Sequence, residues 1–189
     1  MTEKELLIDT LRRLNQTGIP YMLTGSMSSN YWGIPRTTHD LDYVVQLSEP
    51  VIRRFIEAFR GDFDIDEEAI RAACRPPYQF NAIDTRSPFK VDFWLLQPRL
   101  FDRCMFERRI KVNLFGETAW LCTAEDVILH KLYWNNINPS ERQLGDAAGV
   151  VAVQNNALDV PYLNHWAAQL QVIDVLHDLL QGRIRPKQT

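Results

Sequence analysis

Hydrophobic and polar residues alternate along this chain in two successive patterns. Up to about residue 122, short apolar runs rich in β-branched and aromatic residues alternate with amphipathic stretches, as in strands separated by helices. Beyond residue 122 only helical spacing remains. The sequence therefore predicts an α/β (α+β) fold. A mixed-sheet core over 1–122 is followed by a helical subdomain over 123–189 that packs on it.

Apolar spacing, Gly, Pro and capping residues set the expected element boundaries. Leucines between residues 6 and 14 recur at helical spacing, and Gly18 ends that helix. Thr123 can cap a helix, because Asp126 is the third residue after it. We expect strands over 21–25, 40–45, 78–84 and 89–96, a β-hairpin over 109–122, and helices over 3–16, 26–32, 48–59, 66–75, 123–136, 140–154 and 160–181.

Composition narrows the class of protein. A chain of 189 residues suits one compact domain, or a core with a small appendage. Its net charge of −3 gives no overall basic field for nucleic acid. The three cysteines are widely spaced, which indicates reduced thiols and a cytoplasmic protein. No apolar run approaches the roughly 20 residues of a membrane span, so no membrane partner is expected.

Three aspartates are the strongest candidates for chemistry. Asp40 and Asp42 lie two residues apart in a predicted strand, and residues at that spacing face the same side. Two neighbouring carboxylates repel each other unless a cation lies between them, and Mg²⁺ is the usual cation where phosphates are involved. Asp92 lies in a second apolar strand, where an acid needs a partner. If the two strands are neighbours, three carboxylates converge and could hold two divalent ions.

A Gly-Ser turn precedes this acidic strand. Gly25 allows a tight turn, and the amides of Ser26 and Met27 would begin a helix. Helix N-termini attract phosphate through their free N–H groups and the macrodipole. Each feature alone also has a purely structural explanation. The acids could be solvated at a strand edge, Asp92 could be hydrogen-bonded in the core, and Lys90 shares its face and could neutralise it. Their joint order along the chain favours a site.

These features together resemble those of a known superfamily. The chain resembles the nucleotidyltransferase superfamily that includes DNA polymerase beta, in the stretches "TGSMSSNYWGIPRTTHDLDYVV" and "KVDFW". It is most similar to the small bacterial AbiEii-type nucleotidyltransferases of toxin–antitoxin systems, which also carry motifs like "TAEDVILHKLYW" and "SERQLGDAAGVV". The resemblance extends over about residues 20 to 155.

The resemblance implies a role for each matching residue. The three aspartates would bind two Mg²⁺ ions, and Asp92 would also help to activate the acceptor hydroxyl. The triphosphate would be held by Gly25 and Ser26. Lys131 would reach a phosphate, and Asp146 would contact the nucleotide or the acceptor.

For three residues the sequence leaves alternatives open. Arg36 could steady a phosphate or pair with an acid. Lys131 could be a lysine at the edge of a helix whose charged end reaches solvent. Asp146 could form an ion pair with Arg142, four residues earlier on the same helix.

The implied reaction is transfer of a nucleoside monophosphate from an NTP to an acceptor hydroxyl. The acceptor could be a tRNA end, a protein or a small molecule, and the chain could be a toxin with an antitoxin partner. The sequence does not specify the oligomeric state. One alternative is a catalytically idle member that binds a nucleotide or a partner protein as a regulatory module. A metal-dependent phosphohydrolase is disfavoured, because a histidine-rich ligand set is missing.

Overall fold

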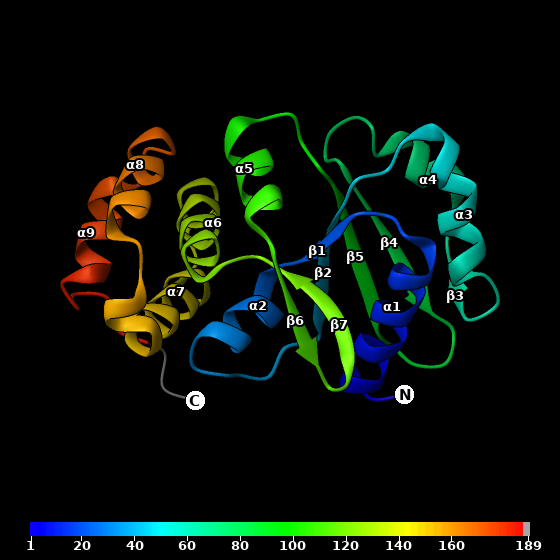
Figure 1. Ribbon diagram of the computed structural model, residues 1–189, viewed down its shortest axis with the longest axis horizontal. Coiled ribbons are helices and arrows are strands. Elements are labelled where there is room, and N and C mark those ends of the chain that lie inside the picture. Colours follow the sequence, from blue (N-terminus) through cyan, green and yellow to red (C-terminus); the bar gives the residue numbers. More distant parts are fainter. Residues whose placement is uncertain (187–189) are drawn as a thin grey trace. The chain divides into compact units, whose positions relative to one another are not determined.

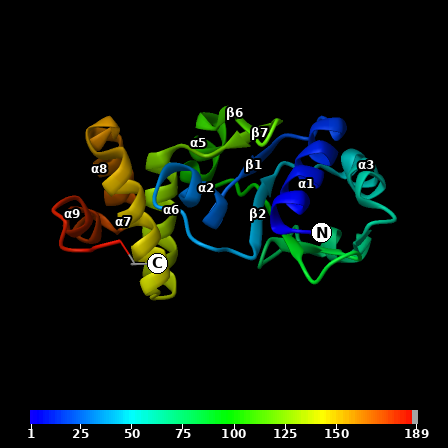
Figure 2. The ribbon, with the colours of Figure 1, turned by 90° about the horizontal axis from the view of Figure 1, so that it is seen from below.

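The computed structural model describes residues 1–186, which form two compact units (Figures 1 and 2). Unit 1 contains residues 1–24 and 39–121, and unit 2 contains residues 25–38 and the chain from 122 onward. The last three residues of the predicted 123–189 subdomain lie outside the described residues. The helices are α1 (Glu3–Thr17), α2 (Gly25–Trp32), α3 (Glu49–Phe59), α4 (Glu67–Ala72), α5 (Leu100–Arg108), α6 (Ala124–Ile137), α7 (Glu141–Gln154), α8 (Val160–Gln169) and α9 (Ile173–Leu180), with a 3₁₀ turn at Asn155–Ala157.

Unit 1 is built on a mixed sheet. Its strands are β1 (Tyr21–Leu23), β2 (Asp40–Val45), β3 (Phe63–Asp64), β4 (Gln79–Asp84), β5 (Lys90–Leu95), β6 (Ile110–Leu114) and β7 (Glu117–Leu121), in the spatial order β3-β4-β5-β2-β1-β7-β6. The β2–β5 and β1–β7 pairs are parallel, and the other neighbours are antiparallel. The predicted α/β fold with a mixed sheet is therefore confirmed.

The two faces of the central strands differ in chemistry, because side chains alternate along a strand. Tyr43 and Phe93 lie on one face and are fully buried. They join Phe55, Phe59 and Phe80 in an aromatic cluster with ring centroids 4.8–5.7 Å apart. The opposite face carries the polar residues of β2 and β5. One face thus supplies the core, which leaves the other available for chemistry.

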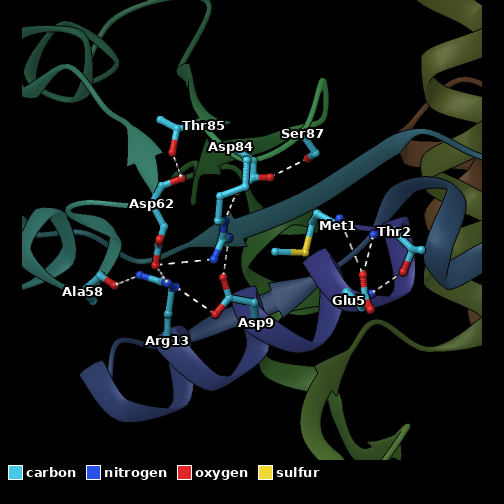
Figure 3. A network of polar contacts seen from close by, with 11 residues as sticks. Met1, Thr2, Glu5, Asp9, Arg13, Ala58, Asp62, Asp84, Thr85 and Ser87 are labelled. Carbon is cyan, nitrogen blue, oxygen red and sulfur yellow. Dashed lines mark hydrogen bonds and ion pairs between the residues drawn. The ribbon is translucent and has the colours of Figure 1, made fainter.

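A polar network fastens α1 to the β3–β4 side of unit 1 (Figure 3). Arg13 on α1 donates to the carbonyl of Ala58 at 2.7 Å and also pairs with Asp62. Arg86, in the turn before β5, bonds to Asp9 at 2.8 Å. Burial alone would raise the pKa of Asp9, but the hydrogen bonds from the two arginines outweigh it and lower the pKa. These contacts explain how a helix rich in charge is held against the sheet.

Unit 2 is helical, and the segment 25–38 belongs to it. The indole N–H of Trp32 donates to the carbonyl of Cys122 at 2.8 Å, and Gln154 on α7 donates to the carbonyl of Trp32 at 2.6 Å. Gly33 allows the close approach of this segment to α7, because a Cβ there would lie 2.7 Å from the backbone nitrogen of Val150. The sequence pattern assigns residues 25–38 to the core over 1–122. In the structure, their backbone contacts group them with the C-terminal helices.

Three elements depart from the expected pattern. Residues 160–181 form two helices instead of one, since Gln171 between them adopts a left-handed φ of 59°. The helix α5 and the short strand β3 were not predicted. Within residues 1–186, no helix has both the length and the apolar character needed to cross a membrane.

Candidate active site

Three aspartates lie on one face of the sheet of unit 1. The strands β2 and β5 pair in parallel, and Asp42 is directly opposite Asp92 while Asp40 is opposite Lys90. Residues opposite each other on neighbouring strands project from the same face, as do residues two apart on one strand. We refer to Asp40, Asp42 and Asp92 as the acid triad. The predicted adjacency of the two strands is confirmed.

Lys90 is the counter-ion of Asp92. Its ammonium group lies 2.9 Å from Oδ1 and 2.8 Å from Oδ2 of that carboxylate. These hydrogen bonds, together with the negative charges of the three carboxylates, raise the pKa of Lys90 above its ordinary value. Neutralisation of Asp92 by Lys90, one of the possibilities left open by the sequence, is thus realised. Asp92 is only 7% exposed, so its charge needs such a partner.

Two further side chains surround the acid triad. Asn81 on β4 is opposite Asp92, and its amide nitrogen, assigned from the hydrogen-bonding pattern, donates to Oδ1 at 2.9 Å. The indole N–H of Trp94 points toward Oδ1 of Asp42 at 3.5 Å. Asn81 was not identified from the sequence as part of this site. The alternation of side chains along β4 places it on the face opposite the buried Phe80 and could have indicated it.

The acid triad suits a divalent cation in its ligand type, since carboxylate oxygens are what Mg²⁺ prefers. As the residues stand, however, no group of three or more Asp, Glu, His or Cys side chains within 1–186 is gathered closely enough to hold a metal ion. The expected convergence within metal-bridging reach is therefore not found. The physical reason is that Lys90 already holds Asp92, and like charges do not approach each other without a cation between them.

In unit 2, a second polar cluster contains four of the residues predicted to bind nucleotide. Arg36 donates through Nε and Nη2 to the two carboxylate oxygens of Asp146, at 2.7 and 2.8 Å. The same Nη2 donates to Oγ of Ser26 at 2.8 Å. Lys131 on α6 donates to Oδ2 of Asp146, also at 2.8 Å. We call Ser26, Arg36, Lys131 and Asp146 the Asp146 network.

Burial makes the Asp146 network electrostatically strong. The side chains of Lys131 and Asp146 are 7% and 6% exposed. Burial alone would raise the pKa of Asp146, but the hydrogen bond from Arg36 and the charge of Lys131 outweigh it and lower the pKa. Two cations share one carboxylate, so the network carries one surplus positive charge. Such a cluster can bind an anionic group such as phosphate.

Asn30 makes two hydrogen bonds to the backbone of the loop that presents Arg36. Asn30 on α2 accepts a hydrogen bond from the backbone N–H of Arg36 at 3.1 Å and donates to its carbonyl at 2.7 Å. Gly25 begins α2 with a φ of 62°, a conformation that glycine adopts without strain. The sequence reasoning missed Asn30, because a contact across six residues in a loop has no simple spacing signal.

The structure decides between the alternatives for three residues. Lys131 is buried, so its description as a lysine at a helix edge is wrong. Asp146 pairs with Arg36 and Lys131, which lie far from it in the sequence, instead of with Arg142. Arg36 pairs with an acid, as one of its two alternatives proposed. For Asp146, two contacts between different segments thus replace the expected contact within one helix.

Solved structures of other proteins share this arrangement of elements. One is an antigenic nucleotidyltransferase-like protein from Paracoccidioides brasiliensis, which is 13% identical to this chain, with 98% of this chain and 94% of the other covered and a TM-score of 0.57. The chain has the nucleotidyltransferase fold. A second is the antibiotic-resistance factor ANT(2'')-Ia, which is 10% identical over 95% of this chain and 97% of that one, with a TM-score of 0.60.

The same resistance factor has also been solved in complex with adenylyl-2''-tobramycin. That structure is 11% identical, covers 90% of this chain and 98% of its own, and has a TM-score of 0.58. No protein-family model matches the sequence, and neither does any curated protein. At these identities the likeness establishes the nucleotidyltransferase fold, and the chemistry must be argued from the residues of this chain.

Proposed function

We propose that the chain transfers a nucleoside monophosphate from an NTP to an acceptor hydroxyl. The observation that carries this proposal is the register of β2 against β5, which puts the three carboxylates of the acid triad on one face. The nucleotidyltransferase fold supports it, because the same fold occurs in an antibiotic-resistance factor solved in complex with adenylyl-2''-tobramycin.

The acid triad would hold two Mg²⁺ ions. When bound, such ions neutralise the charge of the phosphates and assist displacement at phosphorus. Asp92 would also accept the proton of the acceptor hydroxyl, but only after Lys90 has released its carboxylate. Lys90 thus keeps the buried carboxylate neutralised in the absence of metal, and its ammonium can pair with a phosphate oxygen once it is displaced.

The Asp146 network would bind the phosphates of the nucleotide. Its surplus positive charge supports this role, as does the hydroxyl of Ser26 within the network. Gly25 would contribute through the free amides at the start of α2. Asp146 orients Arg36 and Lys131, so we assign it a positioning role at the nucleotide and leave direct contact with the acceptor as the alternative.

The acceptor class remains part of the proposal. A small-molecule hydroxyl is supported by the tobramycin adduct of the structural neighbour. A tRNA end or a protein hydroxyl would fit a toxin, with an antitoxin as partner, as the resemblance to the AbiEii-type branch implies. Among residues 1–186 the three cysteines form no disulfide, which is consistent with a cytoplasmic location.

The decisive experiment is incubation with each labelled NTP and Mg²⁺ in the presence of an aminoglycoside panel, total RNA or protein lysate. We expect one of these acceptors to become labelled by the wild-type chain. Asp42→Asn keeps the size of the side chain and removes one ligand charge, so labelling should fall by orders of magnitude. Equal labelling by both forms would refute the assignment of the acid triad.

The hold of Lys90 on Asp92 favours a second candidate, a nucleotide-binding module without catalysis. In that case an NTP should raise the melting temperature through the Asp146 network alone. The shift would then persist when Mg²⁺ is chelated, and no acceptor would be labelled. A shift that chelation abolishes, together with a labelled acceptor, would instead support catalysis.

A further inference from the structure

Unit 1 contains a cavity of about 800 Å³ at the end of the sheet away from the acid triad. Val45 and Leu95, the last residues of β2 and β5, line it, and so do Gln46 and Gln97 just beyond them. Asp42 precedes Gln46 by four strand positions, which at about 3.3 Å per residue corresponds to roughly 13 Å. The cavity therefore lies at the carboxyl ends of β2 and β5, some distance along these strands from the acid triad.

Its place in the sheet is one where ligands commonly bind. The strands β2 and β5 are parallel neighbours, and after β2 the chain continues through α3 to β3 at one edge of the sheet. After β5 it continues through α5 to β6 at the opposite edge (Figure 1). Two adjacent parallel strands whose connections leave in opposite directions open a crevice at their carboxyl ends, and ligands bind in such crevices.

Two guanidinium groups line the cavity. Arg103 on α5 is exposed and, among residues 1–186, forms no ion pair. The guanidinium carbon of Arg109 lies 4.1 Å from the ring centroid of Phe106 and 5.1 Å from that of Trp120. Its Nε is buried and, within the same described range, has no hydrogen-bond acceptor. Its Nη1 donates to the carbonyl of Phe106, and among residues 1–186 its guanidinium forms no ion pair. Burial lowers the pKa of Arg109.

The rest of the lining limits what could bind. Glu107 contributes one carboxylate, so the charged side chains sum to a single positive charge. Leu47, Leu96 and Phe106 add apolar surface. Tyr78 lies in the wall with a left-handed φ of 61°, which is uncommon for a bulky residue and occurs preferentially at ligand sites. A singly charged anion with an apolar body matches this lining.

We propose that this cavity binds an organic monoanion, such as a carboxylate, a sulfonate or a phosphate ester, with an aromatic or apolar body. Arg103 and Arg109 would contact the anionic group, and the ends of β2 and β5 would contact the body. The site operates independently of nucleotidyl transfer, so it does not rest on the function proposed above.

A pair of fluorescent probes tests the site in the full-length protein. One is the anion 8-anilinonaphthalene-1-sulfonate, and the other is N-phenyl-1-naphthylamine, which has the same rings without the charge. The anion should bind, and Arg103→Ala should weaken it about tenfold, the size of one charge-assisted hydrogen bond. Arg53→Ala, an equal change on the exposed side of α3, should leave the affinity unchanged. The proposal is wrong if neither substitution weakens binding of the anion, or if both weaken it to the same extent. It is also wrong if the neutral probe binds as tightly as the anion.

A second measurement locates the bound anion. Cys74 is exposed and lines the cavity, whereas Cys104 does not line it. The anionic probe should slow the alkylation of Cys74 by iodoacetamide and leave that of Cys104 unchanged, as followed by mass spectrometry. If it protects neither cysteine, or both to the same extent, the probe does not bind in this cavity and the assignment is wrong.

Discussion

Asp146→Asn should destabilise the protein far more than Lys131→Met, although the two side chains contact each other. The Asp146 network contains two cations and one carboxylate. Removing the charge of Asp146 takes away the carboxylate that pairs with both Arg36 and Lys131. Breaking a buried pair in this way costs about 3–5 kcal/mol. Lys131→Met keeps the apolar stem and leaves Asp146 paired with Arg36, so its cost should be about 1 kcal/mol.

The effect of Asp146 should also depend on pH. Its pKa is lowered in the folded protein, because the contacts with the two cations outweigh burial. A carboxylate of this kind contributes stability above its unfolded pKa, about 3.9, and loses it as the pH falls through the folded value. The difference between wild type and Asp146→Asn should therefore be full at neutral pH and shrink below about pH 4.

Urea denaturation followed by far-ultraviolet circular dichroism measures these free energies of unfolding. Asp178→Asn is the matched control, since Asp178 forms an exposed ion pair with Arg183 in the same unit. Exposed pairs contribute less than about 1 kcal/mol. The reasoning fails if Asp146→Asn costs no more than this control, or if Lys131→Met costs as much as Asp146→Asn.

Three further outcomes follow from the site and its surroundings. Lys90→Met removes the cation that competes for Asp92, so the Mg²⁺ concentration for half-maximal transfer should fall about fivefold, the equivalent of about 1 kcal/mol, while Lys111→Met on β6 should leave it unchanged. Mg²⁺ with the cognate NTP should raise the melting temperature, and a chelator should abolish the rise if metal and nucleotide bind together. Gly33→Ala should destabilise by about 1–3 kcal/mol, because the new Cβ would meet backbone at 2.7 Å; Gly149→Ala, with its nearest contact at 3.3 Å, should cost less in the same denaturation assay.

Local patterns predicted the elements that position the acid triad. The apolar alternation of residues 40–45 coincides with β2, and residues 89–96 contain β5. Both strands bury one face in the aromatic cluster, so apolar residues recur along them in a pattern that predicts a strand clearly. By contrast, α5 was missed because charged residues interrupt its short apolar pattern. The break between α8 and α9 was missed because Gln171, which is neither Gly nor Pro, makes the turn.

Contacts over long sequence distances were the least predictable part. Arg36 and Asp146 are 110 positions apart, and no spacing rule relates them. The helical rule suggested Arg142 as the partner of Asp146, since a residue four positions away lies on the same helix face. The carboxylate of Asp146 is buried, and a guanidinium that donates two hydrogen bonds to it neutralises its charge better than a solvent-exposed arginine would. Asp146 therefore pairs with Arg36. The pairing of Lys90 with Asp92 was among the alternatives that the sequence raised, because the two residues are two apart on one strand.

The membership of residues 25–38 in unit 2 bears on how this protein could be divided for engineering. The chain passes between the units at 24/25, 38/39 and 121/122, although the sequence suggests a single boundary near 122. A gene split at that boundary would encode Arg36 in one polypeptide and Lys131 and Asp146 in the other. Neither half would contain the complete Asp146 network, so the C-terminal half would lack Arg36 as a partner of its buried Asp146. If the two halves were co-expressed, their association would bring Arg36 back into contact with the buried carboxylate of Asp146.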